Sequence, residues 1–450
     1  MSRPGPLSGF PELLPEQRLV EQHVVDRLRR TFELHGFAGV ETRAVEPLDQ
    51  LLRKGETSNE VYVLRRLQAA EGESDAGMGL HFDLTVPFAR YVVEHAGKLE
   101  FPFRRYQIQK AWRGERPQEG RYREFTQADI DVVNKDELPF HFDVEIARVM
   151  AEGIASLGDL LPPMRLRVNN RRLIEGFYRG IGAPDPARVI TIIDKLDKLP
   201  AQTVAAMLVD EGGLTDEQAG QCLRLAEIDG GDASGGSAFA ERVHALGVSD
   251  PLLEQGIEEL SSVVEGCASV NGERFAVVAS LGLARGLDYY TGTVFEIYME
   301  GFENLKSVGG GGRYDSLASD GKSSYPGVGI SFGVSRTLLP LIGRGLISGS
   351  RSVPSAVLVA LADEASRPSC DEIAQRLRRN GVPAEVAATP QRFGKQIRYA
   401  ERRGIPFVWF PGDDADQVDQ VKDIRSGDQV DADASTWMPP EDDLWPRVIT

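Results

Sequence analysis

A predicted β-hairpin over residues 101–133 constrains the fold more than any other stretch of this chain. Two runs with aromatic and β-branched character flank a polar turn over 115–120, which contains Pro117 and Gly120. Side chains alternate between the two faces of a strand. One face of the first strand therefore carries Arg105, Gln107, Gln109, Ala111 and Arg113, and one face of the second carries Arg121, Arg123, Phe125, Gln127, Asp129 and Asp131.

The charge of this hairpin differs from that of the whole chain. Residues 101–125 hold seven basic and three acidic side chains, whereas the chain has a formal net charge of −17. Arginines and an aromatic ring at one end of a strand face, with carboxylates further along, suit a polyphosphate, a flat base and a cationic amine in a row. The alternative is an edge hairpin with a solvated basic face, because charge runs usually lie at the surface.

Length and composition limit the remaining possibilities. A chain of 450 residues suggests two to four domains. No apolar run approaches the roughly 20 residues of a membrane span, and the N-terminus lacks the pattern of a signal peptide. Three widely spaced cysteines show no metal-binding spacing, which predicts no zinc or other metal site and favours a reducing, cytoplasmic location.

Periodicity and turn residues predict several further elements. Apolar spacing indicates helices over 16–35 and 137–157, and a strand over 39–46 that ends at Pro47. A further helix is expected to begin near Pro87, where Asp83 and Thr85 are suited to capping it. Residues 169–272 are predicted to be a mainly helical insertion. The glycine run 309–312 is typical of a turn.

The composition changes after residue 345. Residues 346–355 have linker composition, and strands then alternate with helices over 356–410, as in a small α/β domain with a largely parallel sheet. From residue 413 onward eleven acids face three bases, which predicts a partly irregular, solvated tail. The predicted domains are 1–345, containing the insertion, and 356–450, containing the tail.

The order of several motifs resembles class II aminoacyl-tRNA synthetases. WRGERPQEGRYREFTQADID (112–131) resembles their motif 2, GVGISFGVSR (327–336) their motif 3, and residues 37–47 their motif 1. ARGLDYYTGTVFEIY (284–298) and GGGGRYD (309–315) resemble the two signature motifs of the histidyl-tRNA synthetase family. The resemblance extends from about residue 10 to residue 429.

This resemblance implies a fold, an assembly and a reaction. The fold is of mixed α/β (α+β) class, with an antiparallel sheet flanked by helices, a helical insertion and a C-terminal α/β anticodon-binding domain. The assembly is a homodimer formed through motif 1. In the reaction, histidine and ATP, with Mg²⁺, give histidyl-adenylate and pyrophosphate, and the histidyl group then passes to the 3′ end of tRNA(His).

The resemblance also implies roles for individual residues. The catalytic pair is Arg113 and Arg285, which approach the α-phosphate from opposite sides. The implied ATP-binding residues are Arg113, Glu115, Arg121, Phe125 and Arg336. The implied histidine-binding residues are Asp83, Thr85 and Gln127 at the α-amino group, and Asp131, Tyr290 and Tyr314 around the imidazole. Lys395, Arg398 and Arg402 lie three and four residues apart on one predicted helix face, where tRNA contact and plain solvation are equally good interpretations.

The chain departs from the family pattern at three places. Ser335 stands where an acid usually lies beside the motif 3 arginine, His81 stands where an arginine is usual, and the C-terminal segment is unusually acidic. Two non-catalytic alternatives follow. One is the histidine-sensing regulatory subunit of ATP phosphoribosyltransferase, a synthetase-like protein that usually lacks the anticodon domain. The other is a synthetase-like protein that binds tRNA without charging it.

Overall fold

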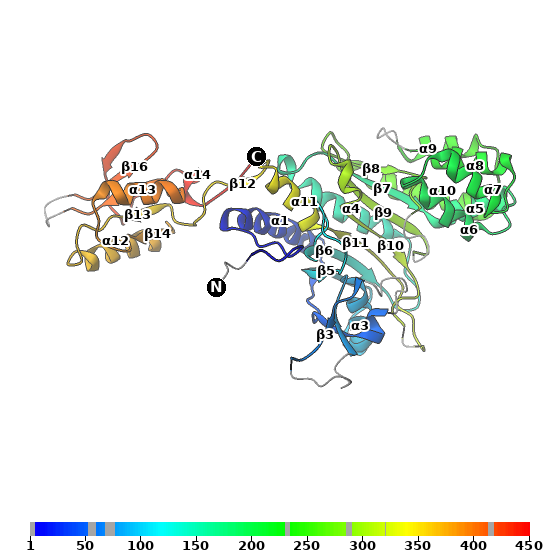
Figure 1. Cartoon of the computed structure of the whole chain (residues 1–450), viewed down its shortest axis with the longest axis horizontal. Helices are drawn as coiled ribbons and strands as arrows, with labels where there is room; N and C mark the ends of the chain where they lie inside the picture. Colours follow the sequence, from blue (N-terminus) through cyan, green and yellow to red (C-terminus); the bar gives the residue numbers. More distant parts are fainter. Residues whose placement is uncertain are drawn as a thin grey trace. The chain divides into compact units, whose positions relative to one another are not determined.

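The chain folds into two compact units. The computed structural model describes residues 5–52, 60–67, 77–229, 235–284, 290–319, 321–412 and 418–450. The first unit consists of Val24–Pro340 together with the residues up to Pro11, and the second of Glu12–His23 and Leu341–Thr450 (Figure 1). In the described part of the chain, no helix is long and apolar enough to cross a membrane.

A large sheet forms the centre of the first unit. Within the described residues it has eight strands in the order β1-β5-β6-β11-β10-β9-β7-β8. The pairs β1–β5 and β7–β8 are parallel and the other neighbours are antiparallel. The strands are β1 Ala38–Gly39, β5 Phe103–Trp112, β6 Glu124–Val133, β7 Met164–Asn170, β8 Phe275–Ala279, β9 Thr293–Met299, β10 Gly309–Tyr314 and β11 Gly327–Phe332. The predicted fold class, a mixed α/β fold with an antiparallel-dominated sheet, is confirmed.

Helices cover one face of this sheet. The helices α4 (His141–Ala155) and α10 (Pro251–Gly266) pack against its strands, and α1 (Pro15–Leu34) touches α4, since Leu28 and Phe32 surround Gly153. The insertion is helical as predicted. It contains α5 Arg171–Gly180, α6 Pro186–Ile193, α7 Ala201–Asp210, α8 Asp216–Ala226 and α9 Gly235–His244 before α10.

The hairpin β5–β6 lies inside the sheet, which excludes the alternative of a solvated edge hairpin. Its strands pair from Phe103 with Val133 to Trp112 with Glu124. Ile130 and Val132 are fully buried on the helix-covered face, where Arg104 also reaches Glu145 of α4 at 2.7 Å. The opposite face of β5 and β6 is polar and carries the side chains that the alternation predicted.

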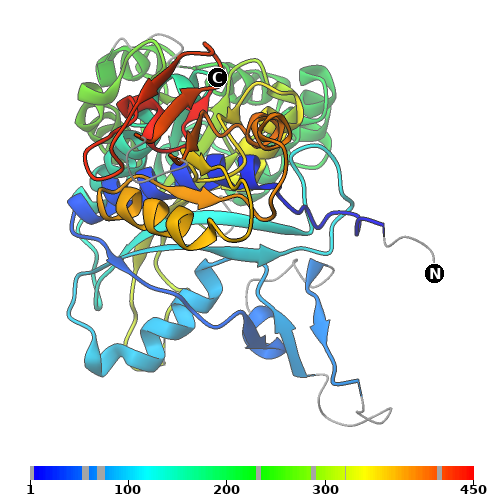
Figure 2. The ribbon, with the colours of Figure 1, turned by 90° about the vertical axis from the view of Figure 1, so that its left-hand side faces the viewer.

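A smaller sheet lies beside the hairpin. It consists of β2 (Val45–Pro47), β4 (Met78–Leu80) and β3 (Val63–Leu64), followed by α3 (Thr85–His95). Figures 1 and 2 show these elements on the β5 side of the large sheet, away from helices α5–α10. A short helix, α2 Leu48–Leu51, connects β2 to the segment before β3.

Two local predictions were wrong. The strand predicted over 39–46 is replaced by two short strands, β1 and β2, because each pairs with a different sheet. The glycine run 309–312 is the first part of strand β10 in the middle of the large sheet. A Cβ atom on Gly311 would lie 2.0 Å from the carbonyl oxygen of Gly329, so the neighbouring strands approach closely only because side chains are missing there.

The second unit contains a five-stranded mixed sheet within the described residues, in the order β14-β13-β15-β16-β17. Strands β13 (Val357–Val359), β14 (Ala384–Val386) and β15 (Phe407–Phe410) are parallel, with α12 (Arg367–Arg379) and α13 (Phe393–Arg403) between them. The acidic tail was predicted to be partly irregular, and its residues 432–440 contain no helix or strand, but other parts of it have regular structure. Its strands β16 (Gln420–Asp423) and β17 (Gln429–Asp431) extend the sheet in antiparallel fashion.

The last residues of the chain also have regular structure. They form α14 (Glu441–Leu444) and β18 (Val448–Ile449), and β18 pairs with β12 (Ser348–Gly349). Arg425 forms ion pairs with Asp423 and Asp443 at 2.8 and 2.7 Å. One cation therefore offsets part of the acidic charge that suggested an irregular tail.

Candidate active site

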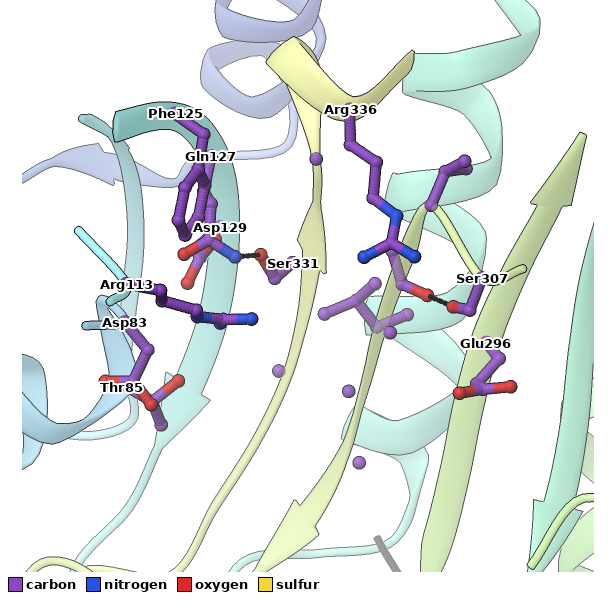
Figure 3. A pocket seen from close by; sticks show the side chains of 18 of the residues that line it. Asp83, Thr85, Arg113, Phe125, Gln127, Asp129, Glu296, Ser307, Ser331 and Arg336 are labelled. Atoms are coloured by element: carbon purple, nitrogen blue, oxygen red, sulfur yellow. Dashed lines mark hydrogen bonds between the residues drawn. The ribbon is translucent and has the colours of Figure 1, made fainter. Parts of the chain in front are cut away.

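A cavity of about 440 Å³ lies on the polar face of the large sheet. Figure 3 shows side chains from β6, β9, β11, the start of α3 and the start of α11 (Val334–Gly343) around it. The predicted ATP- and histidine-binding residues that the structure describes all line this cavity: Asp83, Thr85, Arg113, Glu115, Arg121, Phe125, Gln127, Asp131, Tyr290, Tyr314 and Arg336. Arg285 lies outside the described residues. The structure thus brings together residues separated by up to about 250 positions.

The basic end of the cavity is held by contacts to the backbone and to an aromatic ring. Arg113 donates from Nε to the carbonyl oxygen of Phe82 at 3.0 Å, and its guanidinium lies 5.1 Å from the centre of the Phe125 ring. Arg121 lies 3.1 Å from the Glu115 carboxylate. These contacts orient the cations while leaving them in the cavity, an arrangement suited to a polyphosphate.

The third arginine of the cavity comes from α11. Arg336 donates from Nη2 to the carbonyl oxygen of Leu305 at 2.5 Å. The adjacent Ser335, which departs from the family pattern, accepts a hydrogen bond from the backbone N–H of Thr126 at 2.8 Å. The serine therefore ties the start of α11 to the hairpin, although it does not supply the negative charge of an acid.

The other departure, His81, is also built into the hairpin. Its side chain is completely buried. The ring nitrogen Nε2 lies 2.7 Å from the carbonyl oxygen of Lys110, and the ring packs 5.4 Å from that of Trp112. A histidine here acts as a packing and hydrogen-bonding residue beneath the cavity, where it does not line the open space.

A buried ion pair marks the opposite end of the cavity. Asp131 lies 2.7 Å from Arg105 through Oδ2, and its Oδ1 accepts a hydrogen bond from the Tyr314 hydroxyl at 2.7 Å. Arg105 is fully buried, with its guanidinium 4.2 Å from the centre of the Phe88 ring. Asp131 is therefore fixed in place by two protein groups before any ligand arrives.

Between the two ends lie the residues predicted to hold an amino group. Asp83 accepts a hydrogen bond from the backbone N–H of Val86 at 3.0 Å, so it caps α3 as well as lining the cavity. The capping interpretation and the binding interpretation are thus compatible. Gln127 donates from Nε2 to the Ser331 hydroxyl at 2.8 Å, which orients its amide across β6 and β11.

Tyr290 closes the same part of the cavity. Removal from water, followed by the charges of Asp83 and Asp131, raises the pKa of Tyr290 well above its ordinary value. Its phenol therefore stays protonated at neutral pH and can donate a hydrogen bond to a ligand. A Cβ atom on Gly312 would lie 2.6 Å from the Tyr290 ring, so this glycine provides the space for the tyrosine.

Two glycines of β11 likewise provide space for side chains at the ion-paired end of the cavity. A Cβ atom on Gly329 would lie 2.1 Å from Asp131 Oδ1, and one on Gly327 would lie 2.5 Å from the Tyr314 ring. Such distances are far below van der Waals contact. Glycines of the second signature-like stretch and of the motif 3-like stretch therefore create room for polar side chains of neighbouring strands.

The sequence prediction assigned no role to several residues that line the cavity. They include Glu60, Tyr122, Asp129, Glu296, Ser307 and Ser331. The alternation along β6 placed Asp129 on the correct face, two residues from both Gln127 and Asp131, and this spacing was the available signal. Glu296 is buried in β9 and accepts a hydrogen bond from the Tyr298 hydroxyl. Glu296 pairs with Gly310 of β10, a residue outside its own strand, so no local sequence pattern identified Glu296 as a cavity residue.

The three basic residues predicted to contact tRNA lie in the second unit. Lys395, Arg398 and Arg402 are on α13 and line a separate cavity of about 550 Å³. Their role stays a prediction. Among the described residues, no group of three or more histidine, cysteine, aspartate or glutamate side chains is placed to hold a metal ion.

Comparisons with known proteins agree on one family. The family model described as histidyl-tRNA synthetase matches residues 9–337, and the model described as anticodon binding domain matches residues 355–437. Relatives named histidine–tRNA ligase from Cutibacterium acnes and Micrococcus luteus are each 56% identical, with 100% of this chain and 99% of each relative covered.

Solved structures show the same likeness. The crystal structure of histidyl-tRNA synthetase from a Nostoc species is similar with a TM-score of 0.84 and 31% identity, covering 96% of this chain and 98% of that one. A Bacillus halodurans structure, titled ATP phosphoribosyltransferase regulatory subunit/histidyl-tRNA synthetase, has a TM-score of 0.71. At 18% identity, over 88% of this chain and 96% of that one, it shows a shared fold alone.

Proposed function

The chain belongs to the histidyl-tRNA synthetase family, and we propose that it acts as a histidine–tRNA ligase, a class II aminoacyl-tRNA synthetase, through the cavity on its large sheet. The observation that carries this proposal is the arrangement of the cavity. Arginines and an aromatic ring lie at one end, and a fixed carboxylate with two tyrosines lies at the other. That order suits ATP and histidine placed side by side.

The first step joins the two small substrates. A carboxylate oxygen of histidine attacks the α-phosphorus of ATP, and the bond to the leaving pyrophosphate breaks, which gives histidyl-adenylate. No general base is needed, since the attacking carboxylate is already ionised. What the step requires is positive charge around the phosphorus and a fixed orientation of both substrates. Arg113 and Arg285 are proposed to supply that charge from opposite sides.

The other ATP contacts follow from the same end of the cavity. Phe125 is proposed to stack on the adenine and Glu115 to contact its edge, while Arg121 and Arg336 reach the outer phosphates. We propose that Mg²⁺ enters with ATP, because this ion commonly keeps several waters and binds through one or two carboxylates plus the phosphates. Glu296 is a buried carboxylate of the cavity that fits such partial coordination.

The histidine contacts are proposed at the opposite end. Asp83, Thr85 and Gln127 would bind the α-amino group. Asp131 and Tyr290 would bind the two imidazole nitrogens, because a carboxylate oxygen can accept a further hydrogen bond while a protonated phenol donates one. A site built for two ring nitrogens rejects apolar isosteres, which would leave its buried polar groups unpaired. Tyr314 would act by holding Asp131.

The second step transfers the histidyl group to RNA. A hydroxyl of the 3′-terminal ribose of tRNA(His) attacks the carbonyl carbon of the adenylate, and AMP leaves. The domain predicted at 356–450 is proposed to bind the anticodon, and the match of residues 355–437 to an anticodon-binding family supports this. The predicted boundaries at 345 and 356 and a cytoplasmic location are part of the same proposal.

A homodimer is also proposed, on the resemblance of residues 37–47 to motif 1. Light scattering during size exclusion should give twice the mass of one chain. A single-chain mass at micromolar concentration would contradict the dimer without affecting the proposed chemistry.

ATP–pyrophosphate exchange tests the proposed activity. We expect exchange with histidine and with no other amino acid, and transfer of the histidyl group only to tRNA(His). The regulatory-subunit alternative predicts histidine binding without exchange, and a tRNA-binding protein without ligase activity predicts neither. Absence of exchange with every amino acid would refute the ligase proposal.

A further inference from the structure

Asp129 is a buried acid in the middle of the cavity to which the proposed reaction gives no role. It lies on β6 between Gln127 and Asp131, and only 3% of its surface is exposed. Figure 3 shows Asp129 and Gln127 projecting from the same strand into the same side of the cavity. Its position is therefore between the proposed ATP end and the proposed imidazole end.

The hydrogen bonding of Asp129 is incomplete. The Ser331 hydroxyl, directly opposite in β11, is one partner. The Oδ1 atom has no hydrogen-bond partner among the described residues, although it is buried. A buried carboxylate oxygen without a partner is costly unless a ligand supplies one.

Among the residues that the structure describes, the nearby cations do not offset the negative charge of Asp129. Arg105 is the cation that acts most strongly on it, but this guanidinium is bound to Asp131 at 2.7 Å. Three aspartates that line the cavity, Asp83, Asp129 and Asp131, thus lie near one fully buried arginine in the described part of the chain. Burial first, and then the charge of Asp131, raises the pKa of Asp129 to about 7.

We propose that Asp129 is a further substrate-positioning residue, which binds the α-ammonium group of histidine through its unpartnered oxygen. The inference rests on the ligase function proposed above and adds a fourth residue to the set of Asp83, Thr85 and Gln127. The ammonium group is the better partner than the imidazole for two reasons. It carries a full positive charge at neutral pH, and the ring end already has its carboxylate, Asp131, fixed by Arg105 and Tyr314.

The experiment measures binding of two histidine analogues to the full chain and to D129N. Histidinol keeps the ammonium group and the imidazole but lacks the carboxylate. Imidazole propionate keeps the imidazole and the carboxylate but lacks the amine. We expect D129N to weaken histidinol about 10- to 100-fold, as loss of a charge-assisted hydrogen bond does, and to leave imidazole propionate unchanged or bound more tightly.

A second readout separates binding from a structural role. Asp129 lacks a partner for one oxygen, so D129N should raise the Tm at pH 8, whereas a purely structural acid would lower it. The matched control is D143N, which removes another buried acid of the same unit outside the cavity. Asp143 pairs with Arg313 at 2.6 Å, so D143N should lower the Tm and leave the ratio of the two analogue affinities unchanged.

Each outcome has a defined meaning. Equal weakening of both analogues by D129N, or no weakening of histidinol, would overturn the inference, as would a D129N chain that fails to fold. D129S, a smaller neutral variant, should shift the affinity ratio in the same direction. If the unmodified chain shows no histidine-dependent ATP–pyrophosphate exchange, the ligase proposal fails instead, whatever the variants do.

Discussion

At the scale of single residues, Asp129 changes charge within the ordinary assay range. Its pKa of about 7 lies above the value of 3.8 for a free aspartate, mainly because it is buried. The charged groups around it come from β5, β6, β9, the start of α3 and the segment before β9. Arg105, Asp131 and Asp83 act on Asp129 directly. Tyr290, a protonated phenol, is in turn affected by Asp129 and by Glu296. A ligand cation arriving here would favour the ionised acid.

A pH profile of histidine binding follows from this. We expect the KM for histidine to fall as the pH rises from 6 to 8, because the ammonium group binds the ionised carboxylate. The imidazole of free histidine titrates in the same window, so D129N serves as the control. The difference between the two profiles, measured by ATP–pyrophosphate exchange, should report Asp129, and identical profiles would contradict the assignment.

The stability of the folded chain should also depend on Asp129. Whereas histidine binding is expected to strengthen as the pH rises, the free energy of unfolding is expected to fall. Below about pH 4 the acid is protonated in both the folded and the unfolded chain. Between pH 4 and 7 the unfolded chain ionises first, so the free energy of unfolding falls as the pH rises. D129N should escape this loss, which is roughly 4 kcal/mol by pH 8 for a shift from 3.8 to about 7 at 1.4 kcal/mol per pKa unit. Denaturant unfolding at pH 5 and pH 8 measures the part of this loss that falls between those two pH values, about 3 kcal/mol.

Arg113 provides a prediction at the other end of the cavity. R113A should lower the rate of exchange by about 10²- to 10³-fold, as loss of one charge-stabilising donor does, while the KM for histidine changes little. R104A is the control on the same strand, because Arg104 faces α4 and pairs with Glu145. A parallel loss of histidine affinity in R113A would show that the arginine does more than bind the phosphate.

At the scale of elements, the packing around strands β10 and β11 requires glycines, because a side chain at these positions would collide with neighbouring residues. G329A should displace Asp131, since the new Cβ atom would lie 2.1 Å from its carboxylate oxygen. We expect the KM for histidine to rise more than tenfold, by the size of a charged hydrogen bond, with a lower Tm. G97A is the matched control, because nothing lies within 4 Å of a Cβ atom there. Unchanged histidine binding in G329A would contradict the role of Asp131.

The same elements show what the sequence could and could not predict. Alternation along β5 and β6 placed Gln127, Asp129 and Asp131 on one face, because the period of a strand is a local property. The glycine run was misassigned as a turn because its reason for being a strand lies elsewhere. The space is needed by Tyr290 and by the backbone of Gly329, and such contacts between distant segments leave no local pattern.

At the scale of the whole molecule, the sequence again predicted the features that depend on local patterns and missed those that depend on contacts between distant segments. Periodicity predicted the helical insertion and the alternating strands and helices of the second unit, whereas the antiparallel order of the large sheet followed only from the family resemblance. Composition led us to expect that part of the acidic tail is irregular, and residues 432–440 contain no helix or strand. The tail also contains strand β16, which pairs with β15, and strand β17, which pairs with β16, and Arg425 binds Asp423 and Asp443. Amino-acid composition alone does not show which strands or charged side chains pair with one another.

The basic residues of α13 that line the separate cavity give a testable prediction about tRNA binding. Simultaneous replacement of Lys395, Arg398 and Arg402 by alanine should raise the KM for tRNA(His) in aminoacylation by tenfold or more, with a weaker salt dependence, because fewer phosphates are contacted. ATP–pyrophosphate exchange should not change. Replacing Arg376 and Arg379 of α12 controls for general charge. If both sets have equal effects, the α13 surface has no special role.

The cap on α3 gives the molecule a built-in reporter. Asp83 lines the cavity, and the same carboxylate holds the backbone N–H of Val86 at 3.0 Å. A ligand that draws charge from Asp83 must change the electron density at that amide, although it never touches Val86. The Val86 amide resonance is therefore a remote sensor of occupancy, and the fraying of the first turn of α3 is thermodynamically linked to the release of the amino acid.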